Sequence, residues 1–463
     1  MILESLLPLA YLTSAVCFIV GLKMMSSPRT AVRGNLIGAV GMALAIGAAC
    51  FDRGVASHAL IAGSLAIGAV IGWILAVRVQ MTGMPQMVAL LNGLGGAAST
   101  LVAWSDLLRG SSHPVDTLIA VGATGLIGTV TFWGSLVAYA KLEELKGFRE
   151  PFSLPGQQVI NAMLVIACCG LTGVLASTHE TSVQISCYIG IVVLSTVLGV
   201  FLVNPIGGAD MPVVISLMNS YSGLAGAATG FVIDNNGLII SGSLVGASGV
   251  ILTRIMCKAM NRSLFNVLFG VMGGSKEGGP TDAIYATVRS TSAEDVASIL
   301  DGAQRVVVVP GYGMAVAQAQ HAVRDLAKLL EAKGTTVEYA IHPVAGRMPG
   351  HMNVLLAEAD IAYDKLKEMD EINPTLETVD VAIVLGANDV VNPLAKTDPN
   401  SPIAGMPIIE VDKCRTVVVI KRSLSPGFAK IPNPLFAAPN ALLLYADAQK
   451  ALLDIVKAIK ELG

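Results

Sequence analysis

Residues 306–316 read VVVVPGYGMAV, a run of four valines followed by a Gly-x-Gly turn and the start of an apolar helix. A short β-branched run of this kind predicts a buried strand. Glycines after such a strand let the chain turn sharply and let a pyrophosphate approach free N–H groups at a helix N-terminus. The stretch therefore predicts the first strand, turn and helix of a nucleotide-binding α/β domain. A merely structural turn is the competing interpretation, and Val316 stands where the third glycine of the usual fingerprint would be.

The chain beyond this stretch alternates short β-branched runs with helical patterns. The expected strands are Arg305–Val309, Thr336–Ile341, Val379–Leu385, Ile408–Val411, Thr416–Ile420 and Ala441–Leu444. The expected helices are Ala315–Lys333, His351–Met369 and Gln449–Leu462, with a short turn near Asn392–Lys396. Such alternation is typical of parallel strands joined by crossover helices. It predicts a soluble α/β Rossmann-type domain with a six-stranded parallel sheet and a ligand crevice at the carboxyl ends of its strands.

The part of the chain before this domain is far more apolar. Of the 463 residues, 53% are hydrophobic and only 14% are charged, and the charged residues concentrate in residues 281–463. Crossing a bilayer takes about 20 mostly apolar residues. Nine stretches meet that test: Leu6–Met24, Asn35–Ala49, Leu60–Val77, Gln86–Ala103, Leu118–Ala140, Val159–Ala176, Val183–Val203, Met211–Ile233 and Leu238–Met256. The sequence therefore predicts a membrane all-α bundle of about nine transmembrane helices.

Basic residues in alternate loops predict the orientation, because Lys and Arg stay on the cytoplasmic side. One side holds only Arg53 and Arg109, and the other collects Lys23, Arg29, Arg33, Arg78, Lys141, Lys146, Arg149, Arg254, Lys258 and Arg262. We expect the N-terminus outside, the C-terminal domain in the cytoplasm and the bundle in a bacterial inner (plasma) membrane. The first apolar run follows Glu4 and no basic residue, which favours a retained span over a cleaved signal.

Composition also divides the chain and excludes some functions. A Gly-rich polar link around residues 273–280 suggests a transmembrane domain at 1–262, a linker at 263–285 and a cytoplasmic nucleotide-binding domain at 286–463. The net charge of −3, without a basic stripe, gives no reason to expect nucleic acid. The seven cysteines show no metal-ligand spacing, so reduced thiols and no metal site are predicted.

Two positions favour NADP(H) over NAD(H). NAD sites usually have an acid at the end of the second strand to hold the ribose 2′-OH, but the residues after that strand here include His342 and Arg347. Lys421, Arg422 and Ser423 follow the fifth predicted strand, and two cations beside a hydroxyl suit a 2′-phosphate. A solvated basic pair that closes a strand is the alternative.

A polar loop, residues 386–393, follows the Val379–Leu385 strand at the same edge of the predicted sheet. Within it, Asp389 next to a nicotinamide could sense the redox state, because the oxidised ring is cationic and the reduced ring is neutral. An N-cap of the following turn is the competing interpretation.

The membrane part has few polar residues at depth. Asp210 opens the eighth span, and Asn219 follows nine residues later, about 13 Å along a helix. Asn92 lies in the fourth span. An acid at the mouth of a span that contains buried polar groups suggests a proton path. Helix capping by Asp210 and interhelical hydrogen bonding by Asn219 are the alternatives.

Several long motifs together closely resemble the beta subunit of proton-translocating NAD(P) transhydrogenases. The motifs in the predicted soluble domain are GYGMAVAQAQ at 311–320, HPVAGRMPGHMN at 342–353, GAND at 386–389 and KRS at 421–423. In the membrane part they are DMPVV at 210–214 and NSYSG at 219–223. The likeness covers essentially the whole chain.

The resemblance implies that this chain binds NADP(H) across the edge of the sheet, in an orientation reversed from ordinary Rossmann enzymes. The residues that it implies at the cofactor are Gly311, Tyr312, Gly313, Met314, Ala315, Val316, Val344, Ala345, Gly346, Arg347, Met348, Pro349, Gly386, Ala387, Asn388, Asp389, Val390, Lys421, Arg422, Ser423, Gly427, Phe428, Asp447 and Ala448. Among them, Lys421, Arg422 and Ser423 would hold the 2′-phosphate. Asp389 would couple the redox state to proton movement.

The resemblance also implies a separate alpha subunit that carries the NAD(H) domain, in a dimer of alpha–beta units. We expect proton flow through the bundle to drive hydride from NADH to NADP+, with Asp389, Asp210, Asn219 and Asn92 in the coupling. Some family members have a histidine at the position of Asn92, and asparagine cannot change charge with pH. Relatives also have a tyrosine at the position of Phe428. The alternative function is a secondary transporter or channel with a regulatory cytoplasmic nucleotide-binding domain.

Overall fold

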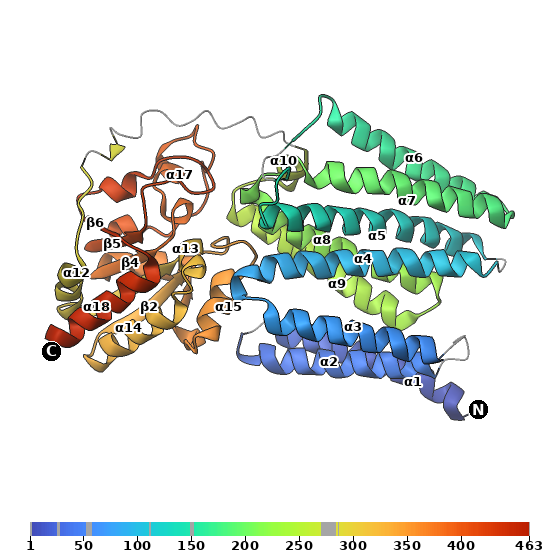
Figure 1. The fold of residues 1–463 in the computed structure, drawn as a ribbon, viewed down its shortest axis with the longest axis horizontal. Coiled ribbons are helices and arrows are strands. Elements are labelled where there is room, and N and C mark those ends of the chain that lie inside the picture. Colours follow the sequence, from blue (N-terminus) through green and yellow to red (C-terminus); the bar gives the residue numbers. More distant parts are fainter. Residues whose placement is uncertain are drawn as a thin grey trace. The chain divides into compact units, whose positions relative to one another are not determined.

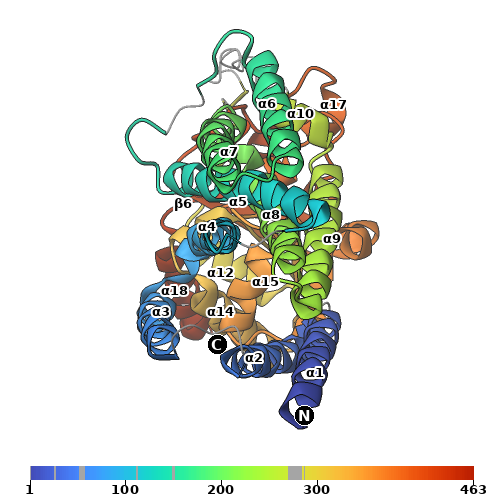
Figure 2. The same ribbon diagram turned by 90° about the vertical axis from the view of Figure 1, so that its right-hand side faces the viewer.

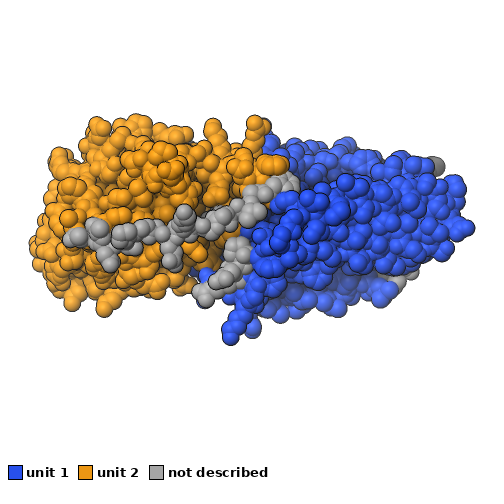
Figure 3. Space-filling model, turned by 90° about the horizontal axis from the view of Figure 1, so that it is seen from above, with its two compact units in different colours: residues 1–206, 214–253 blue, residues 207–213, 254–463 orange. Residues whose placement is uncertain are grey.

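The computed structural model describes residues 2–25, 28–51, 58–110, 113–148, 152–269, 284–285 and 287–462. The chain forms two compact units, coloured separately in Figure 3. Unit 1 comprises residues 1–206 and 214–253, and unit 2 comprises residues 207–213 and 254–463. Most of the expected linker, from residue 270 to residue 283, lies outside the described residues.

Long helices build the N-terminal part of the chain. Within the described residues there are nine: α1 (Ile2–Met25), α2 (Pro28–Cys50), α3 (His58–Arg78), α4 (Met84–Leu108), α5 (Val115–Leu142), α6 (Gln157–Ser177), α7 (Thr181–Val203), α8 (Met211–Val232) and α9 (Asn236–Ala259). Each expected span coincides with one of them. Eight are long and apolar enough to cross a membrane, whereas α8 is less apolar because its middle carries the polar run 219–222. The predicted membrane bundle is confirmed.

Small residues let these helices approach closely. A Cβ added at Gly96 of α4 would lie 2.5 Å from the carbonyl oxygen of Gly128 in α5. One added at Gly242 of α9 would lie 2.4 Å from the backbone nitrogen of Ala227 in α8. Figure 2 shows α8 and α9 side by side. Backbone contact of this kind excludes larger side chains and is how membrane helices gain packing energy without a hydrophobic driving force.

Unit 2 contains a six-stranded parallel sheet. Its strands are β1 (Arg305–Pro310), β2 (Thr336–Ile341), β3 (Leu366–Glu368), β4 (Val381–Leu385), β5 (Thr416–Lys421) and β6 (Ala441–Tyr445). Their order is β3-β2-β1-β4-β5-β6, with Val307 opposite Glu338 in β2 and Ala382 in β4. The strand order reverses at β1, as in doubly wound nucleotide-binding folds, and ligands bind such sheets beyond their carboxyl ends. The Rossmann-type prediction is confirmed.

Helices and irregular segments accompany this sheet in unit 2. The helices of unit 2 are α10 (Leu264–Phe269), α12 (Ala293–Asp301), α13 (Tyr312–Val316), α14 (Gln320–Ala332), α15 (His351–Glu358), α16 (Met369–Ile372), α17 (Leu394–Thr397) and α18 (Ala448–Leu462). On one face α18 packs against α12 and α14 (Figure 1). On the other face an apolar cluster joins the sheet to Ile372, Leu376, Val391 and Phe436.

Short 3₁₀ helices complete the structure. They are η1 (Met81–Gly83), η2 (Gly208–Asp210), η3 (Tyr363–Lys365), η4 (Asn373–Thr378), η5 (Asp389–Val391), η6 (Val411–Lys413) and η7 (Pro434–Ala437).

One predicted strand is wrong. Residues 407–410 form no strand; Ile408 and Ile409 are buried in an irregular segment, and Val411 begins η6. The strand that the sequence analysis did not predict is β3. It is only three residues long and pairs with β2 at the edge of the sheet. A buried loop and a strand show the same short apolar pattern, so the pattern alone did not separate them.

Two predicted helices are shorter than expected. Ala315–Lys333 is divided between α13 and α14, because Gln318 adopts a positive φ of 49°. His351–Met369 ends as a helix at Glu358, and Asp360 follows with a φ of 56°. A residue in the left-handed conformation ends an α-helix.

Candidate nucleotide-binding site

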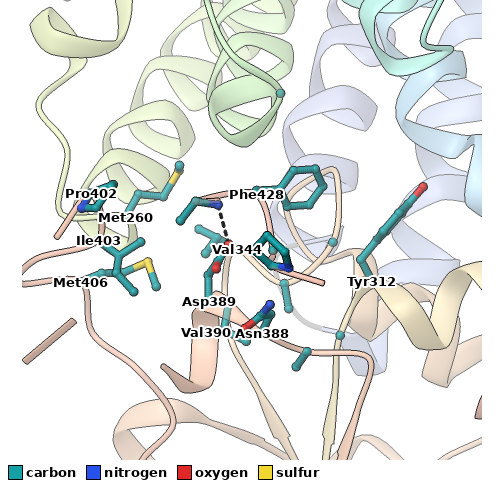
Figure 4. A pocket seen from close by; sticks show the side chains of 18 of the residues that line it. Met260, Tyr312, Val344, Asn388, Asp389, Val390, Pro402, Ile403, Met406 and Phe428 are labelled. Carbon is teal, nitrogen blue, oxygen red and sulfur yellow. Dashed lines mark hydrogen bonds between the residues drawn. The ribbon is translucent and has the colours of Figure 1, made fainter. Parts of the chain in front are cut away.

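A pocket of about 720 Å³ lies in unit 2 beyond the carboxyl ends of four strands (Figure 4). Four segments line it: 311–313 after β1, 344–347 after β2, 386–390 after β4, and the end of β5 at Lys421 with residues 425–429 after it. The remaining lining residues are Gly208, Asp210, Met260, Arg262, Asn400, Pro402, Ile403 and Met406. Ligand pockets usually measure roughly 300–1,000 Å³. The pocket therefore has the size and the place that the sheet topology predicts for a ligand site.

Most of the expected cofactor residues line this pocket. They are Gly311, Tyr312, Gly313, Val344, Ala345, Gly346, Arg347, Gly386, Ala387, Asn388, Asp389, Val390, Lys421, Gly427 and Phe428. The others do not: Met314, Ala315, Val316, Met348, Pro349, Arg422, Ser423, Asp447 and Ala448. Met314 and Ala315 are fully buried in the core, and Asp447 accepts a hydrogen bond from the Gln449 N–H at the start of α18.

The Gly-x-Gly turn lies against the loop after β4. The N–H of Gly311 donates to the Leu385 carbonyl (2.9 Å), and the N–H of Gly313 donates to the Gly386 carbonyl (3.0 Å). A Cβ at Gly313 would lie 2.6 Å from the Gly386 Cα. The N–H groups of these two glycines are therefore engaged within the chain. Their missing side chains let two loops of the chain cross in backbone contact.

Asp389 is a half-buried acid that lines the pocket (Figure 4). Its Oδ2 accepts a hydrogen bond from the Ala429 N–H (3.0 Å), so the side chain binds the loop after β5 instead of capping the turn that it begins. Its Oδ1 is buried and has no hydrogen-bond partner among the described residues. A Cβ at Gly427 would lie 2.7 Å from that oxygen, so glycine is needed there. Burial raises the pKa of Asp389, while the Ala429 N–H and the charge of Lys421 lower it.

Lys421 brings a cation close to this acid. Its Nζ donates to the Ser425 carbonyl (3.0 Å) and lies 4.6 Å from the centre of the Phe436 ring. The side-chain amide of Asn388 makes the most hydrogen bonds when its oxygen faces Lys421, where it accepts from the Lys421 Nζ at 3.2 Å. Burial lowers the pKa of Lys421 to about 8, and the charge of Asp389 opposes that shift. A partly desolvated ammonium of this kind is a strong anion ligand.

The three residues expected at a 2′-phosphate are not equivalent. Lys421 ends β5 and lines the pocket, whereas Arg422 and Ser423 are exposed and do not line it. The Ser423 hydroxyl lies 2.9 Å from the hydroxyl of Ser425. The structure thus places one of the three cofactor candidates in the pocket and two on the adjoining surface.

Aromatic rings form one side of the pocket. The Arg347 guanidinium lies 4.5 Å from the centre of the Tyr312 ring, and the Phe428 ring centre lies 6.2 Å from that of Tyr312. Figure 4 shows Tyr312 and Phe428 on one side of Asp389, with Ile403 and Met406 on the other. Flat rings beside a cation suit a planar, anionic ligand.

His342 holds the loop after β2 through hydrogen bonds to backbone groups. It is buried, its Nδ1 accepts a hydrogen bond from the Val344 N–H (3.2 Å), and its Nε2 therefore carries the proton and donates to the Pro407 carbonyl (2.8 Å). Burial lowers the pKa of His342 to about 4. Its role in the structure is to hold the loop, because both ring nitrogens are occupied by backbone groups.

The second strand supplies no acid to the pocket. Glu338, inside β2, pairs with Arg305 at 2.6 Å and does not line the pocket. Among the described lining residues the carboxylates are Asp389 and Asp210. The ribose-binding acid of an NAD site is therefore absent from the described end of β2, as the sequence predicts.

Asp210 is buried and lies next to a cation. It ends η2, and its Oδ2 lies 3.7 Å from an Nη1 of Arg262. Its Oδ1 has no hydrogen-bond partner in the described part of the chain. Burial raises the pKa of Asp210 and the charge of Arg262 lowers it. The side chain is thus held by an ion pair.

Asn92 lies where α4 contacts α8. The Asn92 amide nitrogen lies 3.4 Å from the Ile215 carbonyl of α8, and Asn219 is one turn further along that helix. Toward α9, Ser216 and Ser220 of α8 donate to the carbonyls of Gly249 (3.4 Å) and Gly246 (2.7 Å).

Asn400, Pro402, Ile403 and Met406 are lining residues that the sequence did not identify. They belong to an irregular segment after α17, far along the chain from the glycine motifs. The cluster of Pro402, Gly405 and Pro407 indicates a loop, but nothing local indicates where that loop packs.

A bundle of long apolar helices and a doubly wound sheet with a ligand-sized pocket at its carboxyl edge define a membrane protein with a Rossmann-type domain. A family model described as NAD(P) transhydrogenase beta subunit matches residues 7–458. Two curated relatives named NAD(P) transhydrogenase subunit beta, one from Rhodospirillum rubrum and one from a specified strain of it, are each 48% identical over an alignment of 468 positions, which covers 98% of this chain and 99% of the relative. The chain belongs to the NAD(P) transhydrogenase beta subunit family.

Proposed function

We propose that this chain is the membrane and NADP(H)-binding subunit of a proton-translocating transhydrogenase, which couples hydride transfer between NAD(H) and NADP(H) to proton movement. Family membership supports the reaction. The observation that carries the assignment of a nucleotide to this chain is the pocket at the carboxyl edge of the sheet, which contains Asp389 with a buried Oδ1 that has no hydrogen-bond partner among the described residues.

The residues present fit a nicotinamide nucleotide with an extra phosphate. Lys421 and Arg347 provide cations for phosphate groups, and Tyr312 and Phe428 provide flat surfaces for a ring. The lining contains no acid from the end of β2 that would repel a 2′-phosphate, within the described residues. When bound, the nicotinamide supplies the chemistry of donating or accepting a hydride.

Asp389 is the residue that we assign to coupling. Burial raises its pKa, which makes protonation easier than for an exposed carboxylate. A cationic oxidised ring nearby favours the ionised carboxylate, and a neutral reduced ring does not. The protonation of Asp389 and the redox state of the nucleotide are then linked. The oxidised nucleotide favours the ionised carboxylate, and protonation of Asp389 in turn weakens binding of the oxidised form relative to the reduced form.

The membrane part would carry the protons. We assign the route to Asn92 and Asn219 within the bundle and to Asp210 with Arg262 at its cytoplasmic end. Since asparagine does not titrate, Asn92 would act by hydrogen bonding. The assembly we propose has the N-terminus outside, lies in a bacterial inner membrane and comprises two alpha–beta units, with NAD(H) on the alpha subunit. Residues 1–262 would form the membrane domain and 286–463 the nucleotide domain.

Substituting Asp389 with Asn tests this function. For the unsubstituted chain we expect tighter binding of NADPH than of NADH. We also expect the ratio of NADP+ to NADPH affinity to rise with pH, because ionised Asp389 favours the cationic ring. The Asp389→Asn protein should keep its fold and lose this pH dependence, whereas Asp412→Asn, at an exposed carboxylate, should retain it.

Calorimetric titration with each nucleotide from pH 6 to pH 9 checks the prediction. Absence of NADPH binding by the unsubstituted chain would contradict the function.

A further inference from the structure

A second pocket lies within unit 1, at one end of the helix bundle. It measures about 550 Å³ and is formed by the end of α4 with Arg109, by His113 and Pro114 before α5, by the first turn of α5, and by residues 231–234 at the end of α8 and after it. Its lining residues are Asp106, Arg109, His113, Pro114, Asp116, Thr117, Phe231, Val232, Ile233 and Asp234. This pocket is at the N-terminal end of α9, and the function proposed above makes no use of it.

An acid and an imidazole meet in this pocket. The His113 Nε2 lies 3.6 Å from the Asp106 Oδ2, and the two side chains are only 10% and 16% exposed. Arg109, Asp116 and Asp234 are the other charged groups that face the pocket. Three carboxylates against one guanidinium leave a formal charge of −2 with a neutral imidazole. A concave, negatively charged site attracts protons, and histidine is the side chain that changes charge in the physiological range.

A stripe of hydroxyl groups on α5 begins at this pocket. Thr117 lines the pocket, and Thr124, Thr131 and Ser135 follow at intervals of seven, seven and four residues, which keeps them on one face of the helix. The last three are fully or almost fully buried. The hydroxyls of Thr124 and Ser135 have no hydrogen-bond partner in the described part of the chain, which is rare for buried polar groups and marks a polar path.

The stripe faces α4 and ends at the level of Asn92. A Cβ at Gly96 would lie 2.9 Å from the Thr131 Cβ, and one at Gly93 would lie 3.1 Å from the Ser135 Cβ. Gly93 directly follows Asn92 in α4. From Thr117 to Ser135 is 18 residues, or about 27 Å along the helix, most of the thickness of a bilayer core.

We propose that the His113–Asp106 pair takes up protons at this end of the bundle and delivers them along the α5 hydroxyl stripe toward Asn92. A proton adds to an imidazole nitrogen, and the carboxylate of Asp106 stabilises the resulting imidazolium. The imidazolium then releases a proton inward and returns to the neutral form, so charge and protons balance. Hydroxyls seven residues apart are about 10 Å apart, so the proposed transfer requires a water molecule to enter each interval. The inference rests on the proposed function and, in the proposed orientation, places the pair on the outer side.

The test uses the complete alpha–beta complex in sealed vesicles, with the pH varied only on the side of the pocket. We expect His113→Gln to lower proton-coupled hydride transfer at least roughly tenfold and to abolish its dependence on that pH, as for loss of a proton-transfer group. Asp106→Asn should have the same effect. His179→Gln is the matched control, because this exposed histidine lies at the same end of the bundle, between α6 and α7. NADPH binding by each variant reports whether the fold is retained.

The outcomes separate the two proposals. Unchanged coupled transfer with an unchanged pH profile in both His113→Gln and Asp106→Asn would overturn the role of the pair while leaving the proposed function in place. Loss of NADPH binding together with coupled transfer in both variants would assign the pair a structural role and also overturn the inference. If the unsubstituted complex transfers hydride without moving protons, the proposed function fails, and the inference fails with it.

Discussion

His342 and Asp389 lie near the same pocket, and burial moves their pKa values in opposite directions. Burial lowers the pKa of His342 to about 4 and raises that of Asp389. The physical cause is shared, because a desolvated site disfavours whichever form carries charge. For His342 both ring nitrogens are matched by backbone groups, so the neutral ring is a stable structural part. For Asp389 one oxygen is unmatched, so its protonation can respond to a ligand.

The titration of His342 predicts acid sensitivity of the fold. Between pH 6.5 and about 4 the unfolded chain protonates this histidine while the folded chain does not. The unfolded state then binds more protons, so stability falls as the pH falls through this window. His342→Gln should be less stable than the unsubstituted protein at pH 7, by about 2 kcal/mol, since one backbone partner loses its hydrogen bond. It should also show a shallower decline toward pH 4.5, measured by thermal melting.

The control for this prediction is His321→Gln, at an exposed histidine at the start of α14. Its melting temperature should follow the unsubstituted curve at every pH. An equally steep acid decline in the His342→Gln protein would show that His342 is not the group responsible.

At the scale of elements, the pocket depends on two loops that cross. The turn after β1 and the loop after β4 are joined by the Gly311–Leu385 and Gly313–Gly386 hydrogen bonds. Gly386 has a φ of 59°, and a Cβ there would lie 2.3 Å from the Gly313 Cα. Since Asp389 follows three residues later, this crossing also sets its position.

Gly386→Ala should therefore be strongly destabilising, by about 3 kcal/mol or more, because rigid backbone atoms leave no room for the added methyl group. Gly334→Ala is the matched control: Gly334 also has a positive φ, 94°, but nothing lies within 4 Å of its Cβ position. It should cost only about 1 kcal/mol. Chemical denaturation of both variants measures the difference, and similar losses would mean that the crossing can relax.

At the scale of the whole molecule, all strands of the nucleotide-binding sheet lie within residues 305–445 of unit 2. The capping box formed by Ser292 and Asp295 begins α12, which packs against α18. The pocket segments after β1, β2, β4 and β5 are all included in that stretch.

We therefore expect a fragment of residues 284–463 to fold alone and to bind NADPH more tightly than NADH. Two-state denaturation and titration of the purified fragment would check both parts of this expectation. The same fragment with Lys421→Met should lose about 1.5–3 kcal/mol of NADPH binding, the value of a charge-assisted hydrogen bond, while Lys413→Met, at an exposed lysine, should not. A fragment that stays unfolded would show that unit 1 is needed for the domain.

The sequence by itself determined the elements whose pattern is local. Nine apolar stretches became nine helices among the described residues, and five of the six expected strands were placed correctly, because hydrophobic periodicity reports directly on burial. It also located the glycine motif and the acid Asp389 at the carboxyl edge of the sheet, since parallel strands end at the same edge.

Tertiary structure decided what depends on segments far apart in the chain. The sheet contains β3 and not the expected strand Ile408–Val411. The N–H groups of Gly311 and Gly313 donate to carbonyls of the loop after β4. Lys421 lines the pocket, whereas Arg422 does not. Tertiary structure also brought His113 to Asp106 across a helix turn and a loop. A local pattern states whether a residue is buried, but not which distant backbone or side chain occupies the space beside it, because that choice is made by packing and hydrogen bonding of the whole fold.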